Sequence, residues 1–164
     1  MTRIALITIL MFGLLFAEVF IGVFGAFSVL FVTFLFMYAR EIRKDKSILI
    51  LFILVGLMID FWKGYPYGVS FTAFSLLLTT YFLLGKIIHS DDFFSRMTRL
   101  MLSFLTAHLL VYVVVYHAEI ALDTMGVFLL KMLPVVFAES LAFMLLKFIA
   151  TQVSYGDSRV RVGY

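Results

Sequence analysis

The sequence has no cysteine, only two prolines and few charged residues among its 164 positions. Without cysteine the chain forms neither disulfides nor thiolate metal sites. Soluble domains carry about 25% charged and about 45–50% apolar residues. This chain is 14% charged and 64% apolar, with a mean hydropathy of +1.13. The composition therefore predicts an integral membrane protein.

Signatures of catalysis and of nucleic-acid binding are also missing. The sequence holds no glycine-rich phosphate loop, no Ser-His-Asp set in a supporting context and no paired acid and base. The net charge of +3 is small and dispersed along the chain, which disfavours nucleic acid as a partner. We expect a protein that is not an enzyme and needs no cofactor or metal.

Polar interruptions divide the chain into apolar runs of helix length. Residues 4–39 are too long for one span, because about 20 helical residues cross a hydrocarbon core. A turn near 22–25 makes two spans, although a single crossing stays open. The predicted fold is all-α: one integral membrane domain over 1–150, a six-transmembrane-helix bundle, and a cytoplasmic tail over 151–164. The predicted spans are 4–21, 24–39, 47–62, 68–86, 100–117 and 126–150.

The distribution of lysine and arginine predicts the orientation. With both termini in the cytoplasm, eleven of the thirteen cations face inward, Lys63 faces outward and Lys131 lies within the sixth span. An excess of cations in cytoplasmic loops is the rule for membrane proteins. The charged loop at 40–46 could also bind anionic membrane lipid, but this topology explains it without such a role.

One acid lies among small and turn-forming residues between the third and fourth spans: Gly56, Asp60, Gly64, Pro66 and Gly68. Helical spacing places Gly56, Asp60 and Gly64 on one face, where a neighbouring helix can approach closely. An acid at membrane depth normally has a partner or a task. Two readings stay open: an interfacial acid that pairs with Lys63, or an acid in a packing or partner-contact groove.

Other polar residues lie within the predicted spans. Glu139 follows a proline by five residues and favours a structural hydrogen bond inside the bundle over a proton relay. Lys131 can reach the outer interface, where Glu18 lies at a similar depth and could pair with it. His108 and Tyr112 belong to a polar-aromatic stripe that indicates a packing face. Histidines at i and i+4, as zinc sites use, are missing, so no metal is expected.

The motif Gly-Leu-x-x-Asp-x-x-x-Gly-x-x-x-Gly over 56–68 resembles that of MreD, the family of rod shape-determining membrane proteins. Six residues stand at the family's motif positions: Gly56, Leu57, Asp60, Gly64, Pro66 and Gly68. Tyr81 matches the aromatic residue that often follows.

This resemblance implies a multi-pass protein of the bacterial inner membrane that binds MreC through its membrane helix and juxtamembrane region. Such a scaffold helps to couple MreB filaments to the peptidoglycan synthase pair of the elongation machinery. Self-association is also open.

The family's bundle is similar to the substrate-binding component of energy-coupling-factor transporters, which supplies an alternative function, vitamin capture in a pocket lined by Trp62, Tyr65 and Tyr67. The first span lacks the Ala-x-x-x-Ala pattern of those components, which disfavours that function. A third reading, a proton-coupled or metal-assisted enzyme, requires Asp60 and Glu139 to converge.

Overall fold

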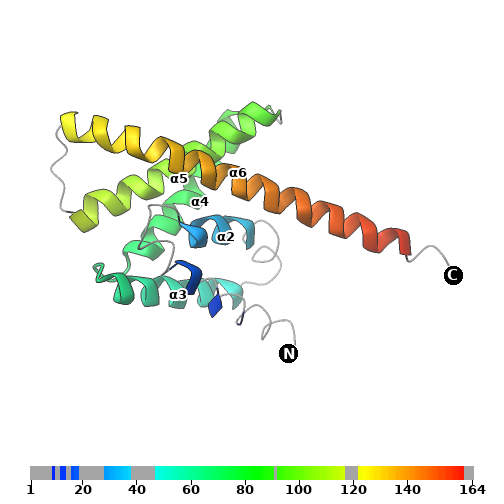
Figure 1. Cartoon of the computed structure of the whole chain (residues 1–164), viewed down its shortest axis with the longest axis horizontal. Coiled ribbons are helices and arrows are strands. Elements are labelled where there is room, and N and C mark those ends of the chain that lie inside the picture. The colour runs from blue at the N-terminus through cyan, green and yellow to red at the C-terminus, as the bar shows by residue number, and fades with distance from the viewer. Residues whose placement is uncertain are drawn as a thin grey trace.

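The computed structural model describes residues 9, 12–13, 16–18, 28–37, 47–90, 92–116 and 122–160. Every regular element in this part of the chain is a helix, which confirms the all-α class. The helices are α2 (Val29–Met37), α3 (Ser47–Lys63), α4 (Val69–Ile87), α5 (Phe93–Tyr116) and α6 (Leu122–Val160). Helix α4 packs against α2, α3 and α5, and α6 packs against α5 and α2. In Figure 1, α5 and α6 cross, and α6 then extends beyond the other helices toward the C-terminus.

Within the described residues, three helices are long and apolar enough to cross a membrane: Val69–Ile87, Phe93–Val115 and Gly126–Ile149. They indicate a membrane protein, as the composition predicts. Helices α3 and α4 agree with the predicted third and fourth spans to within one residue. Helix α2 lies inside the predicted second span, whereas the predicted first span falls mostly outside the described residues. The count of six spans therefore stays a prediction.

Helix α5 begins at Phe93, seven residues before the predicted start of the fifth span at residue 100. Asp92 starts the helix: its Oδ2 accepts the N–H of Ser95 at 3.4 Å, and its carbonyl accepts the N–H of Arg96 at 3.1 Å. Side-chain hydrogen bonds from Ser90 and then Ser95 lower the pKa of Asp92 to about 2. A charged carboxylate at a helix N-terminus is favourable, so a helix begins inside a stretch that looks like a polar connection.

Helix α6 also exceeds its prediction, since it continues to Val160 rather than ending near residue 150. It runs through Pro134, and residues 151–160 hold no proline that would stop it. Polarity marks the expected end of a membrane span but not the end of a helix. The predicted bend at Pro134 stays a prediction.

The core lies where the described helices meet. Its largest fully buried apolar side chains are Phe52, Phe74, Phe104, Leu35 and Leu77. Ala73 and Ala107 are also fully buried, which fits the close packing of α4 on α5. Many large apolar residues are exposed on the outside of the helices, as expected for a surface that lipid covers.

Gly56 lies where α3 packs against Phe71 and Phe74 of α4. A Cβ placed on Gly56 would lie 3.5 Å from the backbone nitrogen of Phe71 and 3.5 Å from the ring of Phe74. These are ordinary contact distances, so one methyl group fits and a longer side chain does not.

We therefore expect Gly56→Ala to leave stability nearly unchanged and Gly56→Leu to lower it by about 1–3 kcal/mol, since the added atoms must push α3 away from α4. Thermal unfolding of both variants in detergent, followed by circular dichroism, measures the difference. Equal melting temperatures for the two variants would contradict the close approach.

Candidate functional site

Asp60 is fully buried and joins α3 to the N-terminus of α4. Its Oδ2 accepts the N–H of Gly68 at 2.7 Å, and its Oδ1 accepts the N–H and the hydroxyl of Ser70 at 3.0 and 2.5 Å. Gly68 is the N-cap residue of α4 and has no side chain that could cap the helix. Asp60 therefore supplies this cap from the preceding helix, and its negative charge meets the positive end of the helix dipole.

Gly64 and Gly68 lie in the turn that connects the end of α3 to the capped start of α4. Gly64 and Gly68 have φ angles of +66° and +90°, a region that other residues adopt at a steric cost. The carbonyl of Asp60 accepts the N–H of Tyr65 at 2.8 Å. Both the backbone and the side chain of Asp60 thus hold the turn, which we call the α3–α4 turn (residues 60–70).

Lys63 pairs with Glu18, at 2.9 Å between Nζ and Oε1, and its Nζ also lies 5.9 Å from the ring centre of Tyr65. The structure thus pairs Glu18 with Lys63, where the sequence pattern had suggested Lys131, whose side chain is exposed. The Asp60 carboxylate accepts hydrogen bonds from Gly68 and Ser70, and Lys63 pairs with Glu18, so the suggested pairing of Asp60 with Lys63 is wrong. A carboxylate with no exposed surface cannot itself contact a partner in this conformation.

Large aromatic side chains beside the buried acid are exposed. Phe61, Trp62 and Tyr67 are each more than half exposed, and we call them the aromatic collar. The ring of Phe16 meets that of Trp62 edge-on at 6.4 Å. Gly64 and Pro66, which lie between Trp62 and Tyr67 in the sequence, are also exposed.

Glu139 forms a second buried junction, between α6, α5 and the start of α2. Its Oε1 accepts the N–H of Ser28 at 2.7 Å, and the Nε2 of His108 lies 2.9 Å from both carboxyl oxygens. Ser28 caps α2, because its Oγ accepts the N–H of Phe31 at 3.2 Å. The predicted hydrogen bond of Glu139 inside the bundle is confirmed.

The remaining candidates lie elsewhere. Tyr112 stacks on Phe128 of α6, with ring centres 4.4 Å apart, which agrees with a packing face. Tyr81 lies twelve residues beyond Val69 along α4, about 18 Å at helical rise, and lines a cavity with residues of α5 and α6. Asp60 and Glu139 have separate hydrogen-bond partners, so nothing here joins them in one reacting site.

The described residues hold no group of three His, Asp or Glu side chains that could bind a metal ion. In the same part of the chain, every buried side-chain nitrogen and oxygen has a hydrogen-bond partner. The buried polar groups thus form satisfied junctions between helices. Sequence reasoning missed Ser70 and Ser28, whose only signals are their places at the starts of α4 and α2.

A scan against protein-family models, a search of curated proteins and a search of solved structures found no match to this chain.

Replacing Asp60 tests the cap. In Asp60→Ala the N–H groups of Gly68 and Ser70 lose their acceptor, and each unsatisfied buried group costs about 1–3 kcal/mol. Ser70→Ala removes only the hydroxyl, and we expect the smaller loss of about 1 kcal/mol. Thermal unfolding of the two variants in detergent ranks them, and an Asp60→Ala protein as stable as wild type would contradict the assignment.

A double-mutant cycle tests the Glu139 junction. Removing one member of a buried polar pair costs about 3–5 kcal/mol, whereas replacing both members by apolar residues costs much less than the sum. We expect Glu139→Leu with His108→Leu to be more stable than the two separate losses predict. Additive losses in unfolding free energy would show that the two side chains act independently.

Proposed function

We propose that this chain is a non-enzymatic membrane scaffold of the bacterial elongation machinery that binds MreC, as its resemblance to the MreD family implies. In this role it sits in the inner membrane as a six-span bundle with both termini in the cytoplasm. It helps to couple MreB filaments to peptidoglycan synthesis and so to maintain rod shape. The observation that carries the proposal is the α3–α4 turn. There the hydrogen bonds of the buried Asp60, which we call the Asp60 brace, lie beside the exposed aromatic collar.

The brace gives the turn a defined shape. Three hydrogen bonds hold the Asp60 carboxylate to the start of α4, and the Asp60 carbonyl closes the end of α3. Because these bonds fix the turn before any partner arrives, binding does not have to order it. Preorganised surfaces bind more tightly for this reason.

The collar supplies the contact in this proposal. Exposed Trp and Tyr side chains are enriched among the residues that dominate binding energy at protein interfaces. Gly64 has no atom within 4 Å of a Cβ placed on it, so a partner's backbone has room to approach. Close approach at small residues is how helices associate in membranes. The membrane helix of MreC and the residues next to it would therefore dock on the collar.

The transporter alternative is less well supported. It requires Trp62, Tyr65 and Tyr67 to enclose a small molecule, but the rings of Trp62 and Tyr67 are more than half exposed. Binding sites for small molecules bury most of the ligand surface. An open collar suits a protein partner better.

Co-purification with MreC from native membranes tests the proposal. The variant Trp62→Ala with Tyr67→Ala removes two collar rings and leaves the Asp60 brace intact. We expect the recovery of MreC to fall about tenfold or more, because aromatic hot spots contribute about 2 kcal/mol or more each.

A matched control is Phe93→Ala with Phe94→Ala. These rings are 55% and 79% exposed, close to the 55% and 75% of Trp62 and Tyr67, but they lie at the start of α5. The control should retain MreC, and circular dichroism should show the same helix content in both variants. Full recovery of MreC with the collar variant, or equal loss in both, would exclude the collar as the binding surface.

A further inference from the structure

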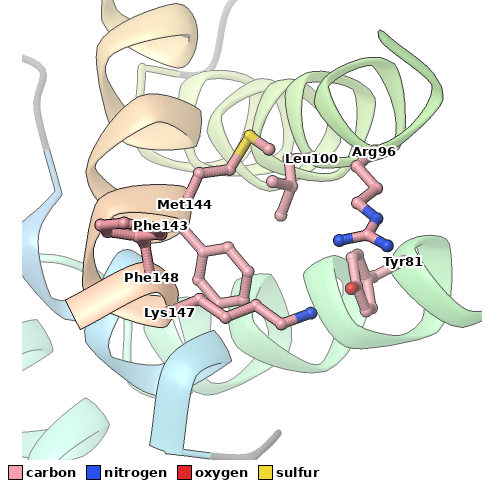
Figure 2. Close-up of a pocket in the computed structure, with 7 residues that line it drawn as sticks. All are labelled: Tyr81, Arg96, Leu100, Phe143, Met144, Lys147 and Phe148. Carbon is pink, nitrogen blue, oxygen red and sulfur yellow. The ribbon is translucent and has the colours of Figure 1, made fainter. Parts of the chain in front are cut away.

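A cavity of about 260 Å³ lies between α4, α5 and α6, away from the α3–α4 turn. Its walls come from seven residues: Tyr81, Arg96, Leu100, Phe143, Met144, Lys147 and Phe148. Figure 2 shows the ends of Arg96 and Lys147 directed toward the side where Tyr81 lies, with the apolar residues of α6 on the other side. The cavity thus has a cationic half and an apolar half.

The polar groups of the cavity are all suited to an anion. Arg96 carries a guanidinium, Lys147 an ammonium and Tyr81 a phenolic hydroxyl. Guanidinium groups bind the oxygens of phosphate in pairs, and lysine adds a compact charge. Two cations from different helices on one small cavity therefore point to a phosphate group rather than to a cation or a neutral ligand.

The cavity lies at the end of the three candidate spans where a lipid headgroup belongs. Tyr81 is near the end of Val69–Ile87, Arg96 is in the first turn of Phe93–Val115, and Lys147 is near the end of Gly126–Ile149. By the distribution of lysine and arginine this end faces the cytoplasm. Basic pockets between membrane helices on this side are known to bind anionic headgroups.

We propose that this cavity binds the phosphate of an anionic phospholipid. Arg96 and Lys147 hold the phosphate oxygens, Tyr81 donates a hydrogen bond, and the lipid chains lie along Met144 and Phe148. Ligand pockets usually have about 300–1,000 Å³, so this smaller cavity suits a headgroup whose chains stay in the bilayer. Free phosphate offers the same chemistry but would leave the apolar half unused. This inference does not depend on MreC binding.

Native mass spectrometry of the purified full-length chain tests the site with three separate probes: phosphatidylglycerol, phosphatidylethanolamine and inorganic phosphate. We expect phosphatidylglycerol to bind about tenfold more tightly than phosphatidylethanolamine, because the ammonium group of phosphatidylethanolamine lies next to its phosphate and is repelled by Arg96 and Lys147. The variant Arg96→Gln with Lys147→Gln should lose this preference.

The control Lys86→Gln with Lys131→Gln removes the same amount of charge outside the lining and should keep the preference. Tyr81→Phe removes only the hydroxyl, and we expect a loss of about three- to tenfold; because it retains the ring, it tests the site even if the double variant fails to fold. Displacement of phosphatidylglycerol by an equal concentration of inorganic phosphate would assign the site to free phosphate, and its retention assigns the site to the lipid.

Two results would contradict the proposed lipid-binding site. One is equal affinity of the wild-type chain for both lipids, with no binding of phosphate. The other is a lipid preference that survives both Arg96→Gln with Lys147→Gln and Tyr81→Phe.

Discussion

A buried carboxylate at the start of another helix is the interaction on which this structure depends, and the described part of the chain contains two examples. Asp60 of α3 accepts the N–H of Gly68, which begins α4, and Glu139 of α6 accepts the N–H of Ser28, which begins α2. Lipid offers no hydrogen bonds to the free N–H groups of a helix end. Each acid satisfies such groups and places its charge at the positive end of a helix dipole.

These junctions explain how a chain with few charges specifies its packing. Apolar surfaces alone do little to choose one helix arrangement in lipid, because lipid tails are as apolar as the side chains. A carboxylate that must meet a particular helix start permits few alternatives. In the α3–α4 turn the same junction also holds the exposed aromatic collar in place. Asp60 thus stabilises the fold there, and the neighbouring collar is the surface proposed to bind MreC.

Sequence reasoning located the helices better than it identified their contacts. Apolar runs predicted α3 and α4 within one residue, because a membrane span has a required length. The start of α5 at Phe93 was missed, since a cap by Asp92 looks like any polar loop. The motif around Asp60 was recognised, but its acid was expected to pair with Lys63 or to meet a partner. The partner groups of Asp60 are mostly backbone N–H groups, which every residue except proline carries, so residue identity gives no signal for them.

Amide hydrogen exchange across the α3–α4 turn tests the central claim most directly, because it reports the hydrogen bonds of Asp60 in the unmodified chain. If Asp60 caps α4 inside the bundle, the amides of Gly68 and Ser70 exchange as slowly as that of Ala73 in the helix core. Exchange at Gly68 and Ser70 as fast as that of an unstructured peptide would contradict the buried cap.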